Sequence, residues 1–297
     1  MTGSTFKQIS SESQQSHRLR APLLNKIGEH YDRRALAFYT SFGVRQGAIT
    51  DEDVEMLKDI LISLPKNEEK LLLIINSPGG DPLAAERIVK VCREFSGHDY
   101  WVLVPGRSKS AATMITLGAS KIIMTATAEL GPIDIQIPWK DKLVPAHVVV
   151  SSYEELMEKG INLPKDQRME PILQQLQEFN APEIEHLKNA RDLSMEIADK
   201  VLKEGMLAGV RKKELDHIMH EFIIPKKLKN HGRPIFFSDL KQIDTQERLS
   251  IELLSNEDEI YSTVHEYHMR LMCGMSSAGM AKTIETPEDE FSIQVNP

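Results

Sequence analysis

Cysteine and long apolar runs are both scarce in this chain of 297 residues. Its two cysteines, Cys92 and Cys273, lie far apart and outside any CxxC pair, which excludes a disulfide framework and a cysteine metal cage. The longest apolar run, Leu71–Ile75, is too short to cross a membrane. Met1–Arg20 holds no apolar stretch after its basic residues, so we expect no secretory signal and a cytoplasmic protein without a membrane span.

Basic residues are fewer than acidic ones, because the chain has 36 Lys and Arg and 44 Asp and Glu, which gives a net charge of −8. Such a surface repels a phosphate backbone. The two local basic clusters, Arg211–Lys213 and Lys226–Lys229, contain no aromatic residues of the kind that stack on single-stranded bases. We therefore interpret both clusters as solvated faces and expect no nucleic-acid partner.

Cofactor motifs are missing as well. No glycine-rich phosphate loop or dinucleotide-binding fingerprint occurs. His265 and His268 stand three positions apart, as two metal ligands can, but no third ligand accompanies them. We expect neither a cofactor nor a metal ion.

Composition divides the chain into four stretches. We expect a polar, flexible N-terminus at 1–25, a folded core at 26–180, a helical part packed on that core at 181–280, and an acidic, flexible tail at 281–297.

Apolar spacing predicts alternating strands and helices in the core. In chain order the predicted elements are a helix at 51–64, a strand at 71–75, a helix at 83–95, a strand at 100–104, a helix at 110–119 and a strand at 121–125. This alternation indicates an α/β fold, with a largely parallel sheet and helices packed outside it. Apolar residues at helical spacing further predict helices at 183–202, 213–222 and 252–272.

Two features of the core carry chemistry. Pro78–Gly80 follows a predicted strand, and its two residues without Cβ let backbone amides approach a ligand closely. This turn either holds an oxyanion or simply joins a strand to a helix. Ser110 begins a predicted helix, where free amides and a partial positive charge stabilise an oxyanion, or where a serine merely caps the helix.

The order of several motifs resembles a known superfamily. The motifs are Ile75–Gly80 (INSPGG), Ser110–Thr113 (SAAT), Leu117–Ala119 (LGA) and Leu130–Asp134 (LGPID). They are similar to those of the Clp-fold serine peptidases, which include ClpP and signal peptide peptidase A. Within that superfamily the chain most resembles the serine dehydrogenase proteinase family, over roughly residues 30–245.

The resemblance implies a ClpP/crotonase-like spiral of β-β-α repeats with a C-terminal helical extension. It also implies a homo-oligomer that cleaves protein or peptide substrates. Ser110 matches the position of the nucleophile, and Gly79 and Gly80 match the glycine pair whose amides form the oxyanion turn. The amide of Ala111 is the further donor. Ser108 is a competing nucleophile that lies outside the matching positions.

The resemblance leaves the general base open. ClpP-type enzymes carry a histidine directly after the motif Leu130–Ile133, and here that position is Asp134. Dyad enzymes carry a lysine further along, and here Ser151 and Ser152 stand near that position.

Several side chains are candidates to act with the serine. Lys140 and Lys142 supply an amine if the loop after Asp134 folds back and burial lowers the pKa of either lysine. His147 is either a neutral imidazole base or a core residue. Asp134 orients a base or caps a turn, and His231 is either catalytic or structural.

These residues support a main hypothesis and two alternatives. The main hypothesis is a serine endopeptidase that uses Ser110 and the amides of the glycine turn. The first alternative is a catalytically silent Clp-fold scaffold or partner-binding protein, because the expected bases are replaced. The second is an acyl-CoA enzyme of the crotonase class, which stabilises an enolate without a nucleophilic serine.

Overall fold

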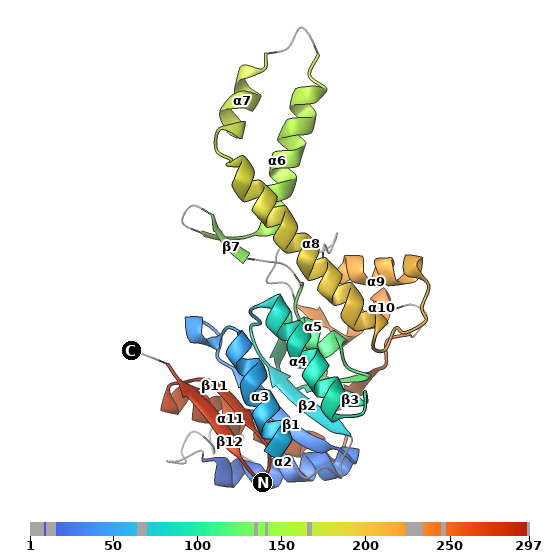
Figure 1. The fold of residues 1–297 in the computed structure, drawn as a ribbon. Helices are drawn as coiled ribbons and strands as arrows, with labels where there is room; N and C mark the ends of the chain where they lie inside the picture. Colours follow the sequence, from blue (N-terminus) through green and yellow to red (C-terminus); the bar gives the residue numbers. More distant parts are fainter. Residues whose placement is uncertain are drawn as a thin grey trace.

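The computed structural model describes residues 9, 16–63, 70–133, 136–139, 142–164, 168–223, 234–244 and 248–295. A seven-stranded sheet lies at its centre, in the order β10-β5-β3-β2-β1-β11-β12 (Figure 1). Five neighbouring strands run parallel, namely β1 (Arg34–Thr40), β2 (Leu71–Asn76), β3 (Tyr100–Val104), β5 (Lys121–Thr125) and β10 (Ile251–Leu254). The expected α/β fold is confirmed.

Helices cover both faces of the sheet, which explains why β2 is apolar from Leu71 to Ile75. One face packs against α3 (Asp51–Ser63), α4 (Pro82–Phe95), α5 (Ala111–Leu117) and α8 (Ala181–Lys203). The other face packs against α2 (His17–Tyr31) and α11 (Tyr261–Ala278). Every residue of β2 is buried, as expected of a strand with helices on both sides.

The predicted elements of the core are confirmed with small shifts at their ends. The predictions at 183–202 and 213–222 correspond to α8 and to α9 (Lys212–Ile223). The single helix predicted at 252–272 is wrong. Residues 251–254 form the edge strand β10, which pairs with β5, and α11 begins only at Tyr261.

The acidic tail expected at 281–297 is wrong. The strands β11 (Met280–Glu285) and β12 (Glu290–Gln294) extend the central sheet, and β11 pairs antiparallel with β1. Burial of this acidic segment is possible because Glu285 is paired with Arg20 at 2.6 Å. Arg20 lies in α2, so the flexible N-terminus expected at 1–25 is also wrong for residues 17–25. Residues 1–8 and 10–15 lie outside the described residues.

Smaller elements complete the fold. They are the three-stranded sheet β4 (Arg107–Ser108), β6 (Glu129–Leu130) and β9 (Ile235–Phe236), the hairpin β7 (Gln136–Trp139) and β8 (Lys142–Pro145), the 3₁₀ turn η1 (Arg45–Gly47), and the helices α6 (Ala146–Ile161), α7 (Glu170–Leu176) and α10 (Phe237–Ile243). Figure 1 shows α6 and α7 projecting away from the sheet, with α8 running from this projection down to α4 and α5. No helix in the described part of the chain is long and apolar enough to span a membrane.

Candidate active site

The two motifs singled out in the sequence meet at one edge of the sheet. Ser77–Gly80 leaves the carboxyl end of β2, and Pro105–Lys109 leaves the carboxyl end of β3 and leads into Ser110. Because parallel neighbours end at the same edge, the two loops lie side by side. A Cβ atom added to Gly79 would lie 2.8 Å from Cβ of Ser110 and 2.9 Å from the amide nitrogen of Ala111.

Ser110 has a strained backbone. Its φ of 52° and ψ of −120° lie in a region that residues with a side chain seldom adopt. The half-buried side chain makes no capping hydrogen bond to α5, so the interpretation of Ser110 as a helix cap does not hold. A serine held on a sharp turn between a strand and a helix is typical of an exposed nucleophile.

Gly79 and Gly80 are both required by close backbone contacts. Gly79 has a φ of 95°, and its carbonyl accepts a hydrogen bond from the amide of Ile49 at 2.8 Å. Gly80 forms a parallel bridge with Ile49, and a Cβ atom at Gly80 would lie 2.2 Å from the Ile49 nitrogen. Ile49 thus holds the glycine turn from the side opposite Ser110.

The two glycine amides have different partners. The amide of Gly79 donates to Oγ of Ser77 at 3.1 Å, so this predicted oxyanion donor is already occupied within the turn. The amides of Gly80 and Ala111 meet no acceptor among the described residues. Two unused amides beside Ser110 are what the stabilisation of a tetrahedral oxyanion requires.

Ser108, the competing nucleophile, is fully buried. Its hydroxyl lies 2.9 Å from Oγ1 of Thr116, and its backbone bridges to Ser77. The hydroxyl is therefore occupied inside the protein, which favours Ser110.

A second wall of the site comes from the segment after β6. Lys109 Nζ lies 2.9 Å from the Glu129 carboxylate and donates to the Leu130 carbonyl at 3.3 Å. A Cβ atom at Gly131 would lie 2.4 Å from Cδ of Lys109, so this glycine allows the segment to approach the serine turn. The buried Thr113 fixes the segment by donating to the Gly131 carbonyl at 3.0 Å. Lys109 and Thr113 were not among the predicted site residues, although Lys109 directly precedes the serine motif and Thr113 is its last residue.

The candidate bases divide into two groups. Asp134, Lys140, His231 and the side chain of Lys142 lie outside the described residues. His147 is half-buried in the first turn of α6, where this helix leaves the β7–β8 hairpin. Within the described ranges, no side chain forms a hydrogen bond with Ser110 Oγ.

The histidine pair on α11 has separate partners. Nδ1 of His268 lies 3.0 Å from the Tyr39 hydroxyl, and burial, with smaller effects of His265 and Arg107, lowers the pKa of His268 to about 4. His265 is exposed and stacks on Tyr261.

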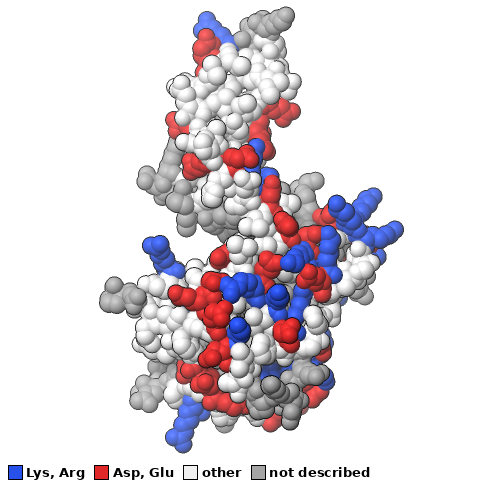
Figure 2. All heavy atoms as spheres, viewed as in Figure 1, with Lys and Arg blue, Asp and Glu red and all other residues white. Residues whose placement is uncertain are grey.

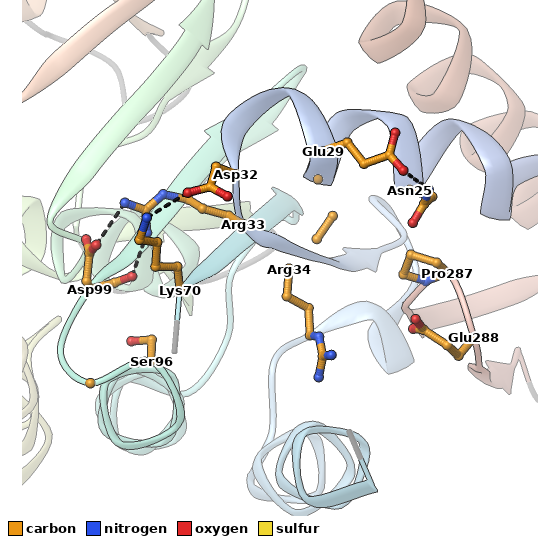
Figure 3. Close-up of a pocket in the computed structure, with 13 residues that line it drawn as sticks. Asn25, Glu29, Asp32, Arg33, Arg34, Lys70, Ser96, Asp99, Pro287 and Glu288 are labelled. Carbon is orange, nitrogen blue, oxygen red and sulfur yellow. Dashed lines mark hydrogen bonds and ion pairs between the residues drawn. The ribbon is translucent and has the colours of Figure 1, made fainter. Parts of the chain in front are cut away.

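A hollow of about 1090 Å³ lies at the other edge of the sheet (Figure 3). Four of the charged side chains that line it are paired with one another, with Arg33 2.8 Å from Asp99 and Lys70 2.7 Å from Asp32. Because Arg34 and Lys70 mark the starts of β1 and β2, this hollow is separated from Ser110 by the length of the strands. It is not part of the candidate active site.

Acidic and basic side chains are interspersed on the face shown in Figure 2. On α4, Arg87 pairs with Asp51 and, at 2.9 Å, with Glu55. On α8, Lys200 pairs with Glu86 at 2.6 Å. Arg87 and Lys200 are therefore both matched by neighbouring carboxylates.

Part of the chain matches a known protein family. Residues 39–163 match the family of ClpP-like SDH-type serine proteinases. The expected resemblance is confirmed over this range, which contains the glycine turn and Ser110. The family is one of serine hydrolases, and its matched segment ends just after α6.

Two relatives from Methanocaldococcus jannaschii align with parts of the chain. The uncharacterized protein MJ0137 is 36% identical over 121 residues, which cover 41% of this chain and 39% of the relative. The uncharacterized protein MJ1495 is 34% identical over 111 residues, which cover 37% of this chain and 36% of the relative. The chain thus aligns with less than half the length of either relative.

Proposed function

We propose that the protein is a serine peptidase in which Ser110 is the nucleophile and the amides of Gly80 and Ala111 bind the oxyanion. The observation that carries this proposal is the strained Ser110 beside two unused amides. The family match over residues 39–163 supports the same reaction class. The substrate class is protein or peptide, and the working form is a cytoplasmic homo-oligomer.

The reaction proceeds by acyl transfer. Ser110 Oγ attacks the peptide carbonyl carbon and gives its proton to a base, while the carbonyl oxygen becomes an oxyanion held by the two amides. Collapse of this intermediate breaks the C–N bond, and the leaving amine takes the proton. Water then attacks the acyl-serine, releases the new carboxyl group and restores the hydroxyl of Ser110.

The base is proposed to be Lys140, Lys142 or His147, with Asp134 as the orienting residue. A lysine acts as a base only when burial disfavours its charged form, whereas a histidine is partly neutral near pH 7 without any perturbation. The pH profile of activity therefore distinguishes them. If a lysine is the base, activity should rise as the pH passes the lowered pKa of its amine. Substitution of that lysine, and not of the other, should abolish the activity.

The alternative is a catalytically silent scaffold. It is favoured by one observation, namely that no described side chain is bonded to Ser110 Oγ. Ser151, near the position where dyad enzymes carry lysine, donates instead to the Val148 carbonyl at 3.2 Å. A silent scaffold predicts a folded assembly whose Ser110 is as unreactive as an ordinary serine.

Intact-mass spectrometry after exposure to a fluorophosphonate tests the proposal. We expect one adduct in the wild-type protein and none in Ser110→Ala. The matched control is Ser108→Ala, which removes a buried hydroxyl two residues away and retains the adduct. Hydrolysis of an unfolded protein should follow the same pattern. Undiminished turnover in Ser110→Ala would exclude Ser110 as the nucleophile, whereas an unreactive wild type without turnover would favour the silent scaffold.

A further inference from the structure

A buried ion pair links the C-terminal hairpin to the start of α3. Lys282 of β11 is 4% exposed, and Asp53 of α3 is fully buried. The ammonium of Lys282 donates to both carboxylate oxygens of Asp53, at 2.9 and 2.7 Å, and to Oγ1 of Thr50 at 3.1 Å. Because these three acceptors surround one buried ammonium group, the hydrogen bonds hold the turn that begins α3 in one position.

The same turn is closed on itself by two further hydrogen bonds. The amide of Thr50 donates to Oδ2 of Asp53 at 2.7 Å, and the amide of Asp53 donates to the Thr50 carbonyl at 3.1 Å. Thr50 is therefore held by its side chain, its amide and its carbonyl. As a result, the backbone of Ile49, the residue before Thr50, is fixed on its carboxyl side.

Ile49 is the residue that holds the glycine turn. Its amide donates to the Gly79 carbonyl at 2.8 Å, and its carbonyl accepts from the Asp81 amide at 2.9 Å. In such a parallel bridge the amide of the residue between them, Gly80, is directed away from Ile49. The direction of the Gly80 amide thus depends on where Ile49 lies.

We propose that Lys282 is a positioning residue of the active site, which sets the Gly80 amide through Thr50, Asp53 and Ile49. This inference rests on the proposed function, because it assigns a role to the Gly80 amide in catalysis. Lys282 lies outside the matched segment 39–163, so the β11–β12 hairpin contributes to the site from a part of the chain that the family match does not include.

The variants must separate positioning from folding. Lys282→Met alone leaves a buried carboxylate without its partner and endangers the fold, so it is combined with Asp53→Leu, which replaces the pair by apolar side chains. Thr50→Val is the milder variant, because it keeps the ion pair and removes one acceptor. Tyr267→Phe is the matched control, since it removes a buried 2.7 Å hydrogen bond to Glu285 of the same strand.

The first readout is the rate of fluorophosphonate labelling of Ser110, with kcat and KM for a peptide substrate. We expect the double variant to label and turn over about 10- to 100-fold more slowly at unchanged KM, because a displaced oxyanion donor acts on the transition state alone. Thr50→Val should be slowed about threefold, and Tyr267→Phe should match the wild type. Wild-type rates in a folded double variant would overturn the inference.

The second readout is hydrogen exchange in the peptides that contain Ile49 and Asp81, which does not require an active enzyme. We expect exchange of these two hydrogen-bonded amides to be at least about tenfold faster in the double variant. If the double variant does not fold, the same increase is expected in Thr50→Val. Tyr267→Phe should show no change. Unchanged exchange would overturn the positioning role even in an active enzyme. Faster exchange in a protein whose wild type resists labelling would instead reject the proposed peptidase.

Discussion

The Ser77 hydroxyl accepts a hydrogen bond from the Gly79 amide at 3.1 Å, inside the turn that faces Ser110. Ser77 is fully buried, and its hydroxyl lies 2.8 Å from that of Thr40 at the end of β1. The neighbouring backbone is also held, because the Ser77 carbonyl accepts from the Lys109 amide at 3.0 Å. One serine therefore joins the glycine turn, the nucleophile turn and the central sheet.

Ser77→Ala should reduce both stability and turnover. The variant leaves the buried Gly79 amide without an acceptor, which costs about 1–3 kcal/mol of unfolding free energy. It also frees the turn that carries the Gly80 amide, so kcat should fall while KM is retained. Urea denaturation and steady-state kinetics measure the two effects. The control is Ser194→Ala, which removes a buried hydroxyl bonded to the Ala190 carbonyl within α8 and should leave kcat unchanged.

Gly79→Ala should inactivate the protein, whereas Gly43→Ala should not. Both glycines have positive φ, 95° and 80°, so alanine is strained by about 1–2 kcal/mol at either position. Their surroundings differ, because a Cβ atom at Gly79 would lie 2.4 Å from the Lys109 carbonyl oxygen and one at Gly43 meets nothing within 4 Å. The measurement is the fluorophosphonate labelling rate of Ser110. Equal labelling of the two variants would contradict the close packing of Gly79 on the serine turn.

The sheet and the site motifs were predictable because local sequence determines them. Apolar runs such as Leu71–Ile75 give buried strands, and glycines at strand ends give tight turns. The family resemblance then singled out Ser110. These predictions needed only neighbours along the chain or a motif. The structure adds that the glycine turn and the serine turn lie side by side.

The C-terminal hairpin was not predictable in this way. Its acidic sequence is typical of a tail, and its burial depends on partners far away in the chain. Glu285 is neutralised by Arg20, 265 positions earlier, and Lys282 by Asp53, 229 positions earlier. Pairing between polar groups far apart in the chain therefore accounts for the error at the hairpin. The Gly79 amide is a different case, because its partner Ser77 is only two positions away, but the spacing of apolar residues does not report the orientation of a hydroxyl.

Acid should destabilise the protein through His268. Burial lowers the pKa of this histidine to about 4, against about 6.5 in an unfolded chain. The unfolded state therefore binds more protons between these values, so stability falls as the pH drops from about 6.5 to 4, by up to about 3 kcal/mol. Urea denaturation across this range measures the loss.

His268→Gln should flatten this pH dependence, because glutamine carries no titrating group and can still reach the Tyr39 hydroxyl. The control is His265→Gln on the exposed face of the same helix, which should retain most of the wild-type slope, because His265 makes only a smaller contribution to the lowered pKa of His268. A wild-type slope in His268→Gln would show that another group is responsible.

The Arg20–Glu285 pair should be a major determinant of stability. Both side chains are almost fully buried, and Glu285 also accepts from the Tyr267 hydroxyl at 2.7 Å. Arg20→Met leaves that carboxylate buried without its cation, so the free energy of unfolding at pH 7 should fall by about 3–5 kcal/mol. The exposed pair of Lys70 and Asp32 is the control, because Lys70→Met should cost less than about 1 kcal/mol. Denaturation curves of the two variants decide the matter. Equal losses would mean that α2 and the β11–β12 hairpin are held together by apolar packing, with the ion pair contributing little.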